Sequence, residues 1–327
     1  MAMRTLRLLA CALALLGGGA TAVHAQQDYP SRPVRIIVPF PAGGGVDVLI
    51  RSVAAELSKR WGHAVVIDNR GGAGSLIGAE AVARSAPDGY TLMATINQTL
   101  TSNRFLYKSL PYDPDKSFAP VALMTTSDQF LIANPSVPAK DLRELVAAVR
   151  ARPGTLAYGS FGNGSQPHLV YELLKAKASL DITHVPYKGV APVMTGLVGG
   201  EIQLATGSAS VAGELLKAGK IKPLAVAGAR RSTLFPDVPT TAEQGYPQLR
   251  AAVWYALVAP AGTPEAVIER IAADVKAILG EPEFARKNAT ARGLEVNAGG
   301  PAELRQAIRD DVAVTREMVQ AAGVKPE

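Results

Sequence analysis

The sequence predicts an α/β fold with mainly parallel sheets, because short apolar strands alternate with helical patterns. Two of these strands run into glycine-rich loops that open helices. Residues 34–38 lead into Pro41–Gly45, after which apolar residues recur at helical spacing over 46–57. Residues 155–160 lead into 161–165 and a helix from about residue 166. The chain is therefore expected to contain two tandem units of similar architecture, each built around one such junction.

The remaining pattern supports two lobes joined by a hinge. Further strands are predicted at 64–67, 90–95, 182–185, 202–205, 224–227 and 253–259, and further helices at 75–85, at 142–149 and through the C-terminal third. We expect the segments 131–134 and 253–259 to cross between the lobes. The first lobe would then comprise residues 26–128 and 252–327, and the second lobe residues 129–251.

The N-terminus has the three parts of a secretory signal peptide. Arg4 and Arg7 precede the apolar run 8–16, and small or compact residues occupy the −3 and −1 positions of a cut after Ala25. The apolar run is too short to span a membrane. Residues 1–25 are therefore predicted to be a cleavable signal.

Removal of that signal changes both cysteine content and charge. Cys11 is the only cysteine, and a lipoprotein cut there would leave almost no apolar core before it. A cut after Ala25 leaves a chain without disulfide or thiolate chemistry. The formal charge falls from +6 to +4, because the signal carries two arginines and no acid. This excess is spread along the chain, so nucleic-acid binding is not expected.

The two glycine loops are the predicted binding elements. Backbone N–H groups at a helix start lack partners and carry partial positive charge, and glycine lets a ligand approach them closely. Ligands of open α/β sheets bind beyond the carboxyl ends of strands, so two facing loops would hold an anion. Either loop could instead be a plain strand–helix connection. Asp47, Ser165 and His168 lie in the first turns, where capping or structural roles compete with ligand contact.

Motifs for catalysis and cofactors are absent from the sequence. Gly71–Gly74 fails the dinucleotide fingerprint, since Ile77 stands where a glycine is required. Tyr158 replaces the first glycine of a nucleophile elbow around Ser160. The four histidines give no pair at zinc-ligand spacing. We therefore expect no cofactor, no metal and no enzymatic activity.

Several short motifs occur in order along nearly the whole mature chain. They are Tyr29-Pro30-Ser31-Arg32-Pro33, Ile36-Ile37-Val38-Pro39-Phe40, Ala42-Gly43-Gly44, Asn69-Arg70-Gly71-Gly72-Ala73-Gly74, Pro87-Asp88-Gly89-Tyr90-Thr91-Leu92, Tyr158-Gly159-Ser160, His184-Val185-Pro186-Tyr187-Lys188-Gly189, Pro236-Asp237-Val238-Pro239-Thr240 and Ala259-Pro260-Ala261-Gly262-Thr263-Pro264. With these motifs the chain resembles the tripartite tricarboxylate transporter substrate-binding family, the Bug-type extracytoplasmic solute receptors.

The resemblance implies a type II periplasmic-binding-protein fold with a ligand cleft between its lobes. It implies that N–H groups and hydroxyls of the 160–165 loop hold a carboxylate, and that the 40–44 loop closes the site partly through ordered water. Side chains that follow other strand ends are further candidates. The expected ligand-binding residues are Phe40, Ala42, Gly43, Gly44, Asp47, Asn97, Ser127, Ser160, Gly162, Asn163, Gly164, Ser165, His168, Tyr187 and Ser208.

The function expected on this basis is capture of a small organic carboxylate in the periplasm for integral-membrane transporter subunits. The receptor would act as a monomer and close its hinge around the ligand. Dicarboxylates, tricarboxylates, acidic amino acids and aromatic acids all fit a carboxylate-binding loop. Two alternatives stay open: a sensor subunit that presents ligand to a membrane signalling protein, and a secreted serine hydrolase that uses Ser160 or Ser165 with His168.

Overall fold

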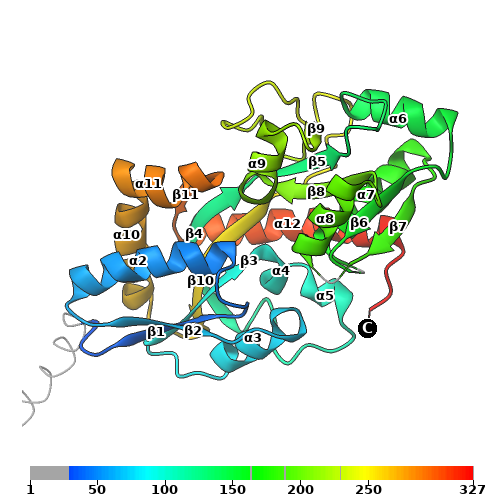
Figure 1. Ribbon diagram of the computed structural model, residues 1–327. Coiled ribbons are helices and arrows are strands. Elements are labelled where there is room, and N and C mark those ends of the chain that lie inside the picture. The colour runs from blue at the N-terminus through cyan, green and yellow to red at the C-terminus, as the bar shows by residue number, and fades with distance from the viewer. Residues whose placement is uncertain (1–28, 163, 188, 229, 327) are drawn as a thin grey trace, which may run out of the picture.

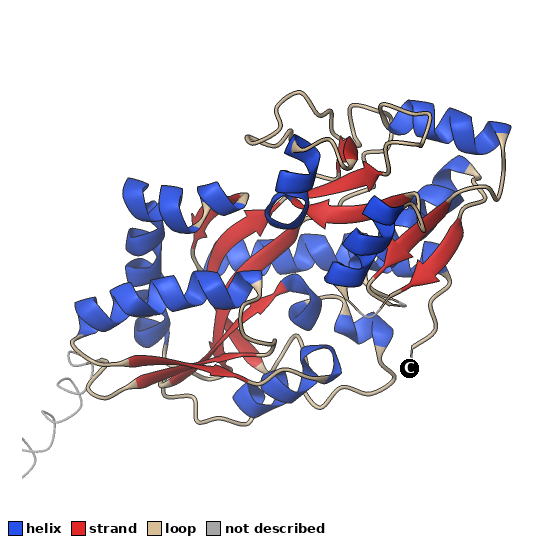
Figure 2. Ribbon diagram, in the orientation of Figure 1, coloured by secondary structure: helices blue, strands red, loops and turns tan. Residues whose placement is uncertain are grey.

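The computed structural model describes residues 29–326 except 163, 188 and 229. The predicted signal peptide, with Cys11, and the predicted site residue Asn163 lie outside these described residues. The described chain forms two β-sheets with helices on both faces of each, so that two α/β lobes lie side by side (Figures 1 and 2). The predicted two-lobed α/β class is confirmed.

The first lobe is built on a six-stranded sheet. Its strands, in spatial order, are β11 (Leu294–Gly299), β4 (Phe118–Ser127), β10 (Val253–Pro260), β3 (Thr91–Ile96), β1 (Val34–Val38) and β2 (Val65–Asn69). Its helical segments are α2 (Gly45–Trp61), η2 (Ala73–Ser75), α3 (Leu76–Ala83), α4 (Asn97–Leu100), α5 (Asn103–Leu106), α10 (Glu265–Gly280), α11 (Pro282–Asn288), η3 (Thr290–Arg292) and α12 (Pro301–Ala322). The apolar stripe of α2 and the buried side of α10 cover one face, while α3 and the start of α12 cover the other.

The second lobe is built on a five-stranded sheet. Its strands, in spatial order, are β7 (Thr183–Pro186), β6 (Ala157–Ser160), β8 (Leu204–Ser208), β5 (Gln129–Ala133) and β9 (Lys222–Val226). Its helices are α6 (Leu142–Ala151), α7 (Gln166–Ala178), α8 (Val190–Gly199) and α9 (Ala209–Lys217). Helices α6 and α7 bury their apolar sides on one face, and α8 and α9 do so on the other.

The prediction of mainly parallel sheets is wrong. Strands β1, β2 and β3 pair in parallel, as do β6, β7 and β8. Strand β10, however, runs antiparallel to β3 and β4, and β5 runs antiparallel to β8 and β9. The reason is that β5 and β10 begin where the chain enters their lobe and run away from the cleft, whereas their neighbours end at the cleft.

Two short connections join the lobes. The chain passes from β4 to β5 at Ser127–Gln129 and returns at Ala251–Val253, and Val253 is the register partner of Ser127. Both predicted crossing segments lie instead inside the lobes. Residues 131–134 are in β5 and the residue after it, and residues 253–259 are in β10 of the first sheet. The two connections are tied together, because the Ala227 N–H donates to Gln129 O and the Ala251 N–H donates to Ala227 O.

The long helix α12 spans both lobes (Figure 1). Its residue Leu304 packs in the core beneath the first sheet, whereas Met318 and Val319 pack in the α6–α7 core of the second lobe. This packing brings the chain's C-terminal residues to the second lobe. Along the described residues, no helix combines the length and apolar character that a membrane span requires.

Candidate functional site

A cavity of about 1100 Å³ lies between the lobes. Both glycine-rich loops, both interlobe connections and the C-terminal tail reach it. The first lobe contributes Phe40, Pro41, Ala42, Gly44, Gly45, Val46, Ile96, Gln98, Leu106, Tyr107, Ser127, Val253 and Tyr255. The second lobe contributes Gln129, Phe161, Gly164, Ser165, Gln166, His168, Val190, Gly207, Ser208 and Val211, and the tail contributes Ala322–Lys325.

The first-lobe loop connects β1 to α2. Gly43 adopts φ +86°, which favours glycine, and its N–H donates to Asp47 Oδ2 at 2.8 Å. Gly45 begins α2 directly against the Tyr255 hydroxyl, and a Cβ there would overlap that oxygen. Close packing against Tyr255 therefore fixes the backbone at this helix start, where Gly44 and Gly45 line the cavity.

Asp47 supports this loop from beneath. Its carboxylate is buried and also accepts from Arg51 Nε at 3.0 Å and Asn69 Nδ2 at 2.9 Å. Burial raises the pKa of Asp47, but the hydrogen bonds from Arg51, Gly43 and Asn69 and the Arg51 charge lower it below its usual value. Asp47 is thus an ionised group that orders the loop, and it is not among the residues that line the cavity.

The second-lobe loop connects β6 to α7 and uses its own N–H groups internally. The Gly162 N–H donates to Ser160 Oγ at 3.1 Å, and the Ser165 N–H donates to Gly162 O at 3.2 Å. The Gly164 N–H donates to His168 Nδ1 at 3.0 Å, with Gly164 at φ +72°. These three amides are therefore not open to a ligand in this state. In the first turn of α7, the amides of Gln166 and His168 have no intrahelical acceptor, and Pro167 has no N–H.

The two loops share one geometry and differ in charge. In each, a glycine with positive φ donates its N–H to the side chain four residues later, Gly43 to Asp47 and Gly164 to His168. The acceptor is a carboxylate in the first lobe and an imidazole in the second. An anionic ligand group is consequently favoured at the second-lobe loop.

A stack of rings supports the second-lobe loop. The imidazoles of His168 and His184 stack at 4.3 Å between centroids, and Tyr158 stacks on His184 at 4.9 Å. Ser160 Oγ lies 2.6 Å from His184 Nε2. Burial lowers the pKa of His168, and burial together with the neighbouring His168 lowers the pKa of His184 to about 4. Both rings are therefore neutral at pH 7.

The predicted site residues divide into two groups. Those that line the cavity are Phe40, Ala42, Gly44, Ser127, Gly164, Ser165, His168 and Ser208. Those that do not line it are Gly43, Asp47, Asn97, Ser160, Gly162 and Tyr187. Asn97 points to Ala252 O and Asp311, and the Tyr187 hydroxyl lies 3.4 Å from Glu201. Ligand contact by the first group stays a prediction.

Sequence reasoning missed three glutamines and the C-terminal tail. Gln98, Gln129 and Gln166 place amide groups around the cavity. Gln98 lies in α4, two residues after the end of β3 and one after the predicted Asn97, so the rule of polar residues just beyond strand ends would have found it. No local signal marks residues 322–325, because the packing of α12 against α7 determines their position.

The wall is poor in charge. Among the described lining residues there is no Asp, Glu or Arg, and Lys325, which is exposed, is the one Lys. The Ser127 hydroxyl is buried and has no hydrogen-bond partner within the described chain. The described residues also contain no cluster of three or more His, Cys, Asp or Glu that would hold a metal ion. The wall therefore offers neutral donors to a ligand.

The fold is similar to that of periplasmic binding proteins. The structure of the periplasmic binding protein BugD is 32% identical, covers 91% of this chain and 100% of its own, and has a TM-score of 0.76. Residues 49–324 match the family model described as the tripartite tricarboxylate transporter family receptor, and the chain belongs to this family. The predicted family resemblance is thereby confirmed.

Individual relatives agree over nearly the full length. Protein BugT of Bordetella pertussis is 35% identical over 308 residues, 94% of each chain. A structure from R. palustris solved with adipate is 35% identical, covers 92% of this chain and 100% of its own, and has a TM-score of 0.80. MatC from Rhodopseudomonas palustris, solved with bound malate, is 33% identical, covers 89% of this chain and 100% of its own, and has a TM-score of 0.75.

Proposed function

We propose that the protein captures a small organic carboxylate between its lobes in the periplasm and presents it to integral-membrane transporter subunits. The observation that carries this proposal is the meeting of two glycine loops, each opening a helix, on one cavity whose described wall holds no acidic side chain. Two relatives in the same family were solved with adipate and with malate, both carboxylates. Membership of a transporter receptor family supports the membrane partner.

The carboxylate belongs at the second-lobe loop. The helix start at Gln166 supplies unpaired N–H groups and the positive end of a helix dipole. The Ser127 hydroxyl, which has no partner within the described chain, adds a neutral donor, whereas the Ser165 hydroxyl already donates to Gly162 O at 2.6 Å. The first-lobe loop lies over the ionised Asp47, so it suits a ligand hydroxyl, a water or an uncharged part of the ligand better than a second anion.

Closure about the two interlobe connections completes the mechanism. Ligand contacts made by both lobes favour the closed form, since a ligand shifts an equilibrium only by its differential affinity for the two states. The lobes that move are residues 26–128 with 252–327 and residues 129–251. The exported receptor is a monomer cut after Ala25, and its closed form is what the transporter subunits recognise.

The two alternative functions gain no support. The family is one of solute receptors rather than of enzymes. Ser160 is fully buried and does not line the cavity, and its hydrogen-bond partner is His184 rather than the expected His168. Ser165, the other serine of that alternative, donates its hydroxyl to Gly162 O at 2.6 Å rather than to His168. No observation favours a sensor subunit over a transporter receptor.

Thermal-shift and calorimetric binding measurements on residues 26–327 test the proposal. The panel contains succinate, adipate, malate, citrate, glutamate and benzoate, with adipamide and glucose as uncharged controls. A carboxylate present at about one hundred times its Kd stabilises the folded state by about 2.7 kcal/mol, which raises the Tm by several degrees. Stabilisation by the uncharged controls alone would show that the cavity does not select carboxylates.

A further inference from the structure

We propose that the ligand carries an apolar body next to its carboxylate, an alkyl chain of several carbons or an aromatic ring, and that Phe40 and Phe161 hold that body from opposite lobes. The inference rests on the proposed carboxylate-binding function and narrows it. Acids with an alkyl chain or an aromatic ring are expected to bind more tightly than compact, hydroxyl-rich polyanions such as malate and citrate.

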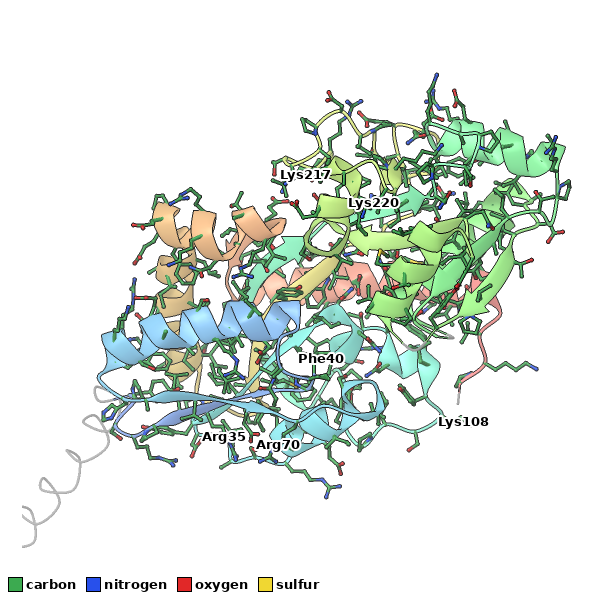
Figure 3. All side chains as sticks on the ribbon, in the orientation of Figure 1. Arg35, Phe40, Arg70, Lys108, Lys217 and Lys220 are labelled. Carbon is green, nitrogen blue, oxygen red and sulfur yellow. The ribbon has the colours of Figure 1, made fainter. Side chains whose placement is uncertain are left out.

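The two phenylalanines occupy corresponding places. Phe40 follows β1 and opens the first-lobe loop, and Phe161 follows β6 in the second-lobe loop. Both rings are half-buried and line the cavity. Figure 3 labels Phe40 near the centre of the molecule, beside the helix α2 that Gly45 begins. Closure of the lobes would bring the two loops together, so rings on both can cover opposite sides of one ligand.

The remaining wall extends the apolar surface. Val190 and Val211 line the cavity from the second lobe and are 37% and 38% exposed, so their apolar surface is open to a ligand. Ile96 and Val253 line it from the first lobe. A ligand with an apolar body would remove these side chains from water on closure and gain affinity by doing so.

The wall offers neutral donors and no arginine for a second carboxylate. Three amides of the second-lobe loop are already paired, two within the loop and one with His168, which leaves the start of α7 there. The Ser127 hydroxyl, at the end of β4, is a further unpaired donor of the described wall. The described wall contains no arginine that could pair with a second carboxylate, and Lys325 lies exposed on the tail. Burying a carboxylate without partners is strongly unfavourable, so a compact polyanion fits this wall poorly.

The size of the cavity leaves room for a body. At about 1100 Å³ it exceeds the usual 300–1,000 Å³ range of small-molecule sites. Before the lobes close, a carboxylate at the start of α7 therefore has space beside it, and most of the lining residues are apolar.

A homologous ligand series on residues 26–327 tests the inference. Calorimetry with butanoate, hexanoate and octanoate is expected to show Kd falling about fourfold per added methylene, or about fifteenfold per step of the series. Malate and citrate are expected to bind at least tenfold more weakly than octanoate. Equal affinities along the series, or citrate as the tightest ligand, would overturn the inference and leave carboxylate capture intact. Absence of binding by every carboxylate would instead refute the proposed function.

Two variants and a matched control test whether Phe40 and Phe161 contact the apolar part of the ligand. Phe40→Ala and Phe161→Ala are each expected to raise the Kd for octanoate about tenfold. Phe235→Ala removes an equally half-buried ring that packs on Phe130 outside the cavity, and it is expected to leave that Kd within twofold. An unchanged Kd in both cavity variants would contradict the assignment. If an alanine variant fails to fold, the wild-type ligand series decides.

Discussion

Acid is expected to destabilise the protein through the histidine stack beneath the second-lobe loop. His184 is held neutral between His168 and Tyr158, and its Nε2 lies 2.6 Å from Ser160 Oγ. The charged groups facing the stack are Glu172, which accepts from the Tyr158 hydroxyl, and Lys175, which pairs with Glu172. Glu172 favours the protonated imidazole and Lys175 opposes it, while burial outweighs both.

The magnitude follows from the depressed pKa. In the unfolded chain the pKa of His184 is 6.5, and in the folded protein burial and His168 lower it to about 4. As the pH falls, His184 is therefore protonated in the unfolded state before it is protonated in the folded state. The free energy of unfolding decreases as the pH falls from about 6.5 to about 4. At pH 5 these two values give a loss of about 2 kcal/mol. Solvent screening of the half-buried ring reduces that loss to about 1 kcal/mol.

Urea unfolding at pH 7 and pH 5 measures this loss. His184→Gln keeps an amide that can hydrogen-bond to Ser160 but does not titrate, so wild type is expected to lose about 1 kcal/mol more than this variant. His63→Gln, in the first lobe and outside the cavity, is the matched control and should follow wild type. Equal pH dependence of wild type and His184→Gln would refute the reasoning.

Three further changes probe the cavity. Ser127→Ala removes a buried hydroxyl that has no partner among the described residues, so we expect unchanged or slightly raised stability but about tenfold weaker octanoate binding. Equal affinity by calorimetry would show that this hydroxyl does not contact the ligand. Lys325→Ala should weaken octanoate binding about threefold at low salt and less at high salt. Lys108→Ala removes an exposed lysine outside the cavity wall and should leave the Kd unchanged. Equal effects of the two substitutions would show that Lys325 has no specific role. In Gly164→Val the new side chain would clash with Leu106, and φ at this position is +72°, which favours glycine. We expect more than tenfold weaker octanoate binding with the circular-dichroism spectrum retained. Wild-type affinity would show that the geometry of this loop is unimportant for binding.

The sequence predicts the parts of the site that local chemistry determines. Glycines between a strand and a helix mark a junction with few alternatives, and both predicted loops reach the cavity through Phe40, Gly44, Gly164 and Ser165. Apolar periodicity likewise placed the start of α2 close to Gly45, where the structure has it.

Features that depend on distant pairing escaped prediction. The direction of β10 depends on its partners β3 and β4, and no local pattern encodes it. His168 and His184 meet because β7 pairs in parallel with β6, whose loop leads into α7. The internal use of the Gly164 amide by His168 follows from the loop's backbone angles, which residue types alone do not determine.

A crystal structure of residues 26–327 with octanoate tests the central claim most directly. The octanoate carboxylate is expected within about 3 Å of the Gln166 and His168 N–H groups of α7 and of Ser127 Oγ. The alkyl chain of the ligand is expected to lie between Phe40 and Phe161. A carboxylate on the first-lobe loop above Asp47, or a ligand bound outside the space between the lobes, would contradict it.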